Sequence, residues 1–78
     1  MSKQTQGHDL EDLTPSAKLV YKILEYEAPL TKKQIVEESR LTQRTVYNAI
    51  TELEDLNYID SEPRTKDLRQ RIYWIRSQ

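Results

Sequence analysis

The sequence predicts a single small α+β domain, made of three helices followed by a two-stranded β-hairpin. Apolar residues recur at helical spacing between residues 17 and 56, and the pattern changes after residue 57 to the alternation typical of β-strands. A chain of 78 residues is too short for a second hydrophobic core. We expect residues 1–9 to form a flexible polar tail and residues 10–78 to form the domain.

The first helix is predicted over residues 15–27. Thr14 and Pro15 are typical of a helix start, because Thr caps free backbone amides and Pro at the first helical position loses no hydrogen bond. Pro29 ends the helix, because the residue before a proline is pushed out of helical geometry. The stripe expected to face the core consists of Ala17, Val20, Ile23 and Leu24.

The second helix is predicted over residues 32–39 from a capping box at its start. Thr31 and Gln34 have the spacing at which each side chain satisfies a free backbone amide beside the other. Ile35 and Val36 are expected to point towards the core.

The third helix is predicted over residues 43–56, with Thr42 as its cap. Asn57 follows as the closing residue, because Asn tolerates the left-handed conformation better than most side chains. The stripe expected to face the core consists of Val46, Ala49, Ile50, Leu53 and Leu56.

Two strands are predicted after the helices, over residues 58–61 and 71–75, because both segments are rich in β-branched and aromatic residues. The segment between them, residues 62–70, is polar and is interpreted as a basic loop. Tyr73 and Trp74 face opposite sides of the second strand, so one of them is expected near the surface, where aromatic residues often contact a partner.

Charge is segregated along the chain. The net charge of −1 argues against a general polyanion binder. Residues 31–50 carry four bases and two acids, residues 51–62 carry five acids and no base, and residues 63–78 carry five bases and one acid. The charge of each segment matters more than the net charge of the chain when one surface of the protein contacts a partner.

The second and third helices, with the short connection between them, form a helix-turn-helix, whose second helix usually reads the major groove of DNA. The outward positions near the start of the third helix carry no acid, and their types suit base edges, methyl groups and phosphates. These positions are Gln43, Arg44, Tyr47 and Asn48, with Thr45 and Thr51 at the margin. The alternative is an ordinary solvated face, since any capped amphipathic helix exposes polar residues in its first turns.

The predicted hairpin adds cations beside that helix. Arg64, Lys66, Arg69 and Arg71 lie close together in the sequence, and Asp67 is the one acid among them. A basic loop between strands tracks phosphates or places an arginine in the minor groove, although charge also keeps an ordinary hairpin soluble. Thr42, Lys32 and Lys33 are expected to lie near phosphates as well.

These motifs resemble the winged helix-turn-helix domains of MarR-type proteins, especially short archaeal members. The resemblance covers roughly residues 13–75 and depends on Thr45-Val46, Leu53-Glu54, the run of residues 56–59 and Asp67-x-Arg69. It implies that Arg69 enters the minor groove and that Asp67 braces it. Members usually have Gly where this chain has Asn57, and they are longer and dimerise through additional terminal helices. Whether this chain dimerises, and by which surface, is left open.

Enzyme activity, metal binding and cofactor binding are not expected. The chain has no Cys, its only histidine, His8, lies in the polar tail, and its single Gly excludes a glycine-rich phosphate loop. Serines of the domain therefore lack a folded histidine to activate them. No apolar run approaches the roughly 20 residues that a bilayer span needs, so we expect a soluble cytoplasmic protein without a membrane partner.

The sequence thus predicts a small transcriptional regulator that binds double-stranded DNA sequence-specifically, with no small-molecule ligand evident. The partner is expected to be double-stranded DNA, and two copies on a pseudo-palindromic site are a reasonable expectation if the chain forms a homodimer. The alternative is a protein-interaction adaptor of a transcription or replication assembly, with the acidic residues 52–62 as its contact face.

Overall fold

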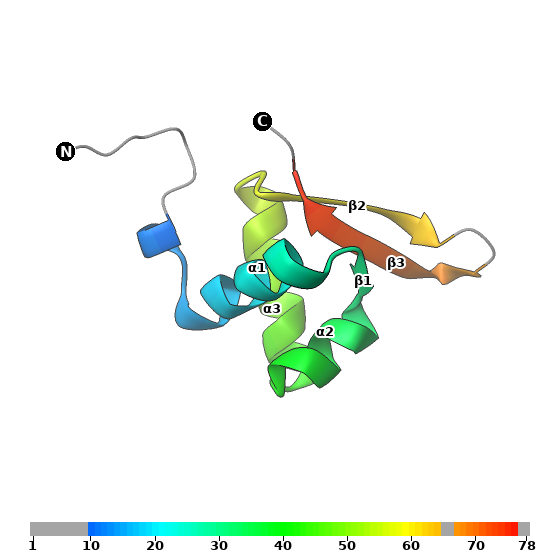
Figure 1. Ribbon diagram of the computed structural model, residues 1–78, viewed down its shortest axis with the longest axis horizontal. Coiled ribbons are helices and arrows are strands. Elements are labelled where there is room, and N and C mark those ends of the chain that lie inside the picture. Colours follow the sequence, from blue (N-terminus) through cyan, green and yellow to red (C-terminus); the bar gives the residue numbers. More distant parts are fainter. Residues whose placement is uncertain (1–9, 65–66, 77–78) are drawn as a thin grey trace.

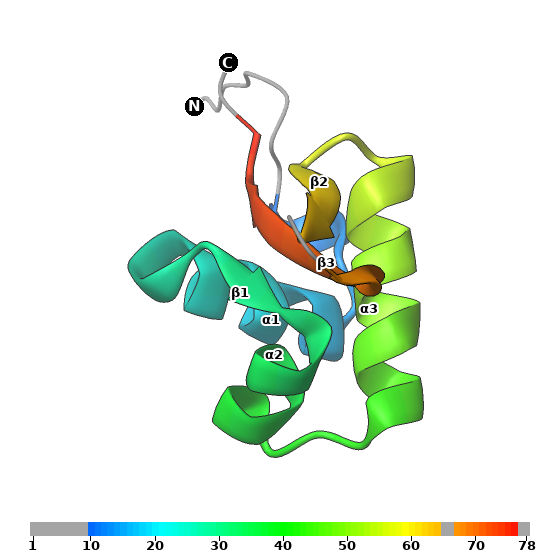
Figure 2. The ribbon, with the colours of Figure 1, turned by 90° about the vertical axis from the view of Figure 1, so that its right-hand side faces the viewer.

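The computed structural model describes residues 10–64 and 67–76 and, of residues 67–69, the backbone alone. Figure 1 and Figure 2 show a group of helices with a β-hairpin extending from one side. In chain order the elements are η1 (Leu10–Asp12), α1 (Pro15–Glu27), β1 (Leu30–Thr31), α2 (Lys32–Ser39), α3 (Gln43–Asp55), β2 (Ile59–Arg64) and β3 (Asp67–Ile75).

Each α-helix begins at the residue that the sequence predicts, because local caps determine the start. Thr14, Thr31 and Thr42 accept hydrogen bonds from the backbone N–H three residues later, at 3.3, 3.1 and 3.1 Å. The capping box of α2 is complete, since the Thr31 N–H donates to Gln34 Oε1 at 2.9 Å.

Two helix ends are closed by residues in the left-handed conformation. Arg40 follows α2 with φ of 64°, and Asn57 follows α3 with φ of 63°, which confirms the prediction for Asn57. The third helix ends at Asp55, one residue earlier than predicted. Leu56 is therefore outside the helical periodicity and 46% exposed, so its predicted place in the buried stripe is wrong.

The core lies between the three helices and the inner face of the sheet. Its largest fully buried side chains are Leu24 and Val20 of α1, Ile35 of α2, and Leu53 and Val46 of α3. Full burial of such side chains contributes about 1.5–3 kcal/mol each. The Tyr21 ring meets the Tyr58 ring edge to face, with centroids 6.0 Å apart, and Val36 is only half-buried against this core.

The described residues form an antiparallel sheet in the order β1–β3–β2, with one strand more than the sequence predicts. The extra strand, β1, pairs Leu30 with Tyr73 and Thr31 with Ile72. Sequence patterning misses it because a two-residue strand has no alternation of its own. Strands β2 and β3 are also longer than predicted, so most of the expected basic loop at residues 62–70 is strand. The α+β winged helix-turn-helix class is confirmed.

Candidate nucleic-acid interface

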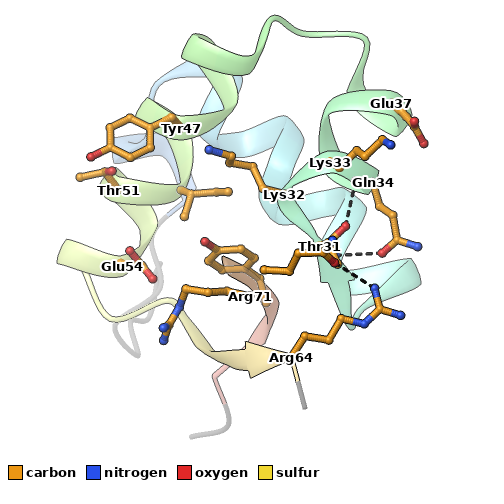
Figure 3. A pocket seen from close by; sticks show the side chains of 13 residues that line it. Thr31, Lys32, Lys33, Gln34, Glu37, Tyr47, Thr51, Glu54, Arg64 and Arg71 are labelled. Carbon is orange, nitrogen blue, oxygen red and sulfur yellow. Dashed lines mark hydrogen bonds between the residues drawn. The ribbon is translucent and has the colours of Figure 1, made fainter. Parts of the chain in front are cut away.

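A groove of about 690 Å³ lies between α2, α3 and the β2–β3 hairpin, which we call the wing (Figure 3). Six sequence-predicted site residues line it, two from each element: Lys32 and Lys33, Tyr47 and Thr51, Arg64 and Arg71. The other lining residues are Thr31, Gln34, Glu37, Ile50, Glu54, Gln70 and Tyr73. The fold therefore brings the helix-turn-helix and the basic wing to the same side of the molecule.

The first turns of α3 present polar side chains away from the core. The first turn contains no acidic residue. Thr45 and Thr51 are half-buried, as expected for positions at the margin. The exposed side chains are Thr42, Gln43, Arg44, Tyr47 and Asn48. The described part of the chain thus leaves the predicted reading face open to solvent.

The two threonines at the start of α3 are joined through their hydroxyls. Thr42 Oγ1 accepts from the Thr45 N–H and donates to Thr45 Oγ1 at 2.9 Å. A hydroxyl has one proton to donate, so in this pairing the proton of Thr45 is not used by Thr42.

Lys32 and Tyr47 approach each other across the groove. The Lys32 Nζ lies 5.5 Å from the centroid of the Tyr47 ring, a distance at which the ammonium is attracted to the face of the ring. Tyr47 nevertheless keeps 57% of its surface exposed. This contact joins α2 to α3 while leaving both side chains accessible.

Arg64 and Arg71 of the wing donate hydrogen bonds to other side chains of the wing, one of which is bonded in turn to α3. Arg64 Nη1 donates to Gln70 Oε1 at 3.2 Å. Arg71 donates from Nε and Nη2 to Ser61 Oγ at 3.2 and 3.1 Å, and Ser61 Oγ donates to Glu54 Oε2 at 3.3 Å. Each arginine is thus oriented by hydrogen bonds within the protein.

Glu54 lines the groove, although it is not among the residues that the sequence predicts for the interface. Helical periodicity would have placed Glu54 beside the predicted interface residues of α3. Tyr47, Thr51 and Glu54 are spaced by four and then three residues, which places them on one face of a helix (Figure 3).

Tyr73 is buried below this cluster. Burial raises the pKa of its hydroxyl, the Glu54 carboxylate raises it further, and the Arg71 guanidinium acts in the opposite direction. The hydroxyl therefore stays neutral at physiological pH, and both charges act at the floor of the groove.

No protein-family model matches the sequence, and no curated protein matches it significantly. Among solved structures, similar chains include PcaV, a transcriptional regulator from Streptomyces coelicolor crystallised with its natural ligand, at 20% identity and TM-score 0.79 over 85% of this chain. The MepR–DNA complex of S. aureus has 22% identity and TM-score 0.77 over 85% of this chain. ZitR of Lactococcus lactis, a zinc-responsive MarR family member, has 25% identity and TM-score 0.74 over 82% of this chain.

This chain has the MarR-type winged-helix fold. It spans 47%, 55% and 44% of the PcaV, MepR and ZitR chains, and therefore about half of their length. The likeness at these identities concerns the fold of the domain.

The side chains of three predicted residues of the MarR-type wing fall outside what the structure describes. Lys66 lies outside the described residues, and of Asp67 and Arg69 only the backbone, at the start of β3, is described. The brace between Asp67 and Arg69 stays a prediction.

The acidic residues 52–62 include three that contact different elements of this MarR-type fold. Glu52 accepts from the Thr14 N–H and from Thr14 Oγ1, at 3.0 and 2.8 Å, and so connects α3 to the start of α1. Asp60 lies 3.8 Å from Arg76 Nε. With Glu54 in the groove, these acids serve different parts of the molecule.

Within residues 10–64 and 67–76, no group of three or more His, Cys, Asp and Glu side chains is placed to hold a metal ion. None of the helices in that part of the MarR-type domain is long and apolar enough to cross a membrane. The sequence gives no sign of a small-molecule ligand. The groove has the size of a small-molecule site, so the expected absence of a ligand stays a prediction.

Proposed function

We propose that this chain binds double-stranded DNA sequence-specifically as a small transcriptional regulator. The observation that carries the proposal is the groove to which α2, α3 and the wing each contribute polar or cationic side chains. A duplex approaching this side meets an open, acid-free helix start and four cations at once.

Base recognition is assigned to the exposed start of α3, which enters the major groove. Arg44 suits the acceptors of guanine, and Gln43 and Asn48 suit adenine. Tyr47 reaches thymine methyl groups or phosphates beside them. Helix geometry fixes the spacing of these side chains, which is what sequence discrimination requires.

Phosphate contacts are assigned to the rim of the groove. Lys32, Lys33, Arg64 and Arg71 supply charge, Lys66 extends it along the wing, and the hydroxyls of Thr42, Thr45 and Thr51 supply hydrogen bonds. Arg69 is assigned to the minor groove with Asp67 as its brace, on the resemblance to MarR-type domains. A homodimer on an inverted repeat gives two such readers a single site.

The test is binding of a fluorescent random-sequence duplex, measured by anisotropy over a series of salt concentrations. We expect the logarithm of the binding constant to fall linearly with the logarithm of the salt concentration, by about 0.9 for each phosphate neutralised. Selection from a random duplex pool then identifies the preferred site. Absence of binding at low salt would contradict the proposal.

A protein-interaction role is favoured by the outer face of the sheet. Ile72 and Trp74 alternate with the buried Tyr73, so they lie on the opposite face and stay partly exposed. Their cross-strand partners are the acids Glu62 and Asp60. This face suits a partner with apolar and basic side chains, and such binding is compatible with DNA on the other side.

A further inference from the structure

The hydroxyl of Ser61 connects a carboxylate of α3 to a guanidinium of the wing. It donates its proton to Glu54 Oε2 and accepts from Arg71 Nε and Nη2. One donor and two acceptors are the whole capacity of a hydroxyl, so all of it is used. We call this arrangement the Glu54–Ser61–Arg71 bridge.

The bridge occupies the edge of Arg71 that suits phosphate best. The Nε and Nη2 groups of an arginine donate in parallel, and this fork matches two oxygens of a phosphate. Here both groups point to Ser61. A phosphate that binds this edge must displace the hydroxyl.

The bridge also places a negative charge where DNA would lie. Glu54 is exposed and lines the groove with Lys32, Lys33 and Arg64 (Figure 3). Tyr73 lines the groove beside both charged groups, and its pKa, which burial raises, is raised further by Glu54 and lowered by Arg71. The carboxylate therefore repels an incoming phosphate and attracts the cation that the phosphate needs.

We propose that Glu54, through Ser61, competes with DNA phosphates for Arg71 and so lowers the affinity of the protein for DNA of any sequence. The inference rests on the proposed function and adds an affinity-determining residue to it. A chain with this device depends more on the base contacts of α3, because phosphate contacts supply most of non-specific binding.

The experiment is a double-mutant cycle between Glu54→Gln and Arg71→Gln, measured with a random-sequence duplex at several salt concentrations. We expect E54Q to tighten binding roughly two- to fivefold, the range of one exposed ion pair. The slope of the logarithm of the binding constant against the logarithm of the salt concentration should become steeper by up to about 0.9, because Arg71 then neutralises a phosphate. In the R71Q background, E54Q should change neither quantity beyond the effect of the control below.

The matched control is Asp55→Asn, which removes the same charge from the neighbouring residue, an exposed position that does not line the groove. Glu54→Ala is a second variant, since it removes the acceptor of the Ser61 proton as well as the charge. Thermal unfolding of each variant checks that the fold is kept.

Three results overturn the inference in different ways. If E54Q behaves like D55N, or tightens binding equally in the R71Q background, Glu54 acts only through general charge while DNA binding stands. If E54Q weakens binding, the bridge assists the DNA complex instead of competing with it. If no variant and no wild-type protein binds duplex DNA at low salt, the proposed function fails and the inference fails with it.

Discussion

The start of α3 and the wing face the same groove but hold their polar groups in different ways. On α3, the backbone of a capped helix sets the positions of Gln43, Arg44 and Asn48, and their side chains are exposed. In the wing, Arg64 and Arg71 are oriented by hydrogen bonds to neighbouring side chains. The helix backbone fixes the point from which each side chain extends. Hydrogen bonds between side chains, in contrast, are exchanged for hydrogen bonds to a ligand when the ligand binds. This difference suits α3 to discrimination between sequences and the wing to control of affinity.

Ile35→Ala removes the support that both regions share. The Ile35 side chain is fully buried, so we expect a loss of about 2–5 kcal/mol in the free energy of unfolding, from lost burial and the cavity left behind. Denaturant titration measures this loss, and Glu38→Ala on the exposed side of α2 is the control. A loss no larger than that of the control would mean that α2 is not anchored through Ile35.

Asn48→Ala and Arg44→Ala separate the two regions most clearly. Each should cost about 1–3 kcal/mol of binding free energy at particular base pairs and little elsewhere in the site. The measurement compares each variant on the selected site and on the same site with single base-pair changes. An equal loss on every duplex would assign these side chains to phosphates and remove the contrast with the wing.

Thr42→Ala tests whether the cap at the start of α3 stabilises the protein. The Thr42 hydroxyl accepts from the Thr45 N–H, so its loss should lower the free energy of unfolding by about 1 kcal/mol. Gln43→Ala, next to it and without a capping role, should leave stability almost unchanged. Thermal unfolding of both variants decides whether the cap contributes as the geometry indicates.

Arg64→Gln should have the smallest effect and the least dependence on sequence. We expect the slope of the logarithm of the binding constant against the logarithm of the salt concentration to become shallower by about 0.9. The variant should prefer the same duplexes as the wild type, in the same order. Anisotropy titrations on the selected site and on a random duplex provide both values. A change in sequence preference would show that the wing reads bases as well.

The features predicted correctly from the sequence are those fixed by neighbouring residues. The starts of the three helices follow from Thr14, Thr31 and Thr42, each of which caps an amide three residues away. Strand β1 was missed because Leu30 and Thr31 become a strand only by pairing with residues more than 40 positions later.

The same limit applies to the candidate site. Charge and spacing identified the cations that line the groove, since these properties belong to single segments. The Glu54–Ser61–Arg71 bridge joins α3, β2 and β3, and only tertiary structure brings these residues within hydrogen-bonding distance. Glu54 was accordingly absent from the residues that the sequence predicts for the site.

The residue before α1 and the last described residue, Arg76, are both bonded at the far end of α3. Glu52 binds Thr14 just before α1, and Arg76 donates its N–H to the Tyr58 carbonyl at 3.0 Å and its Nη1 to Asn57 Oδ1 at 3.2 Å. Gln43 begins α3 at its opposite end. A fluorophore or a fused protein attached before residue 10 or after residue 76 is thus joined to the domain through segments that enter it at the end of α3 opposite the predicted reading face.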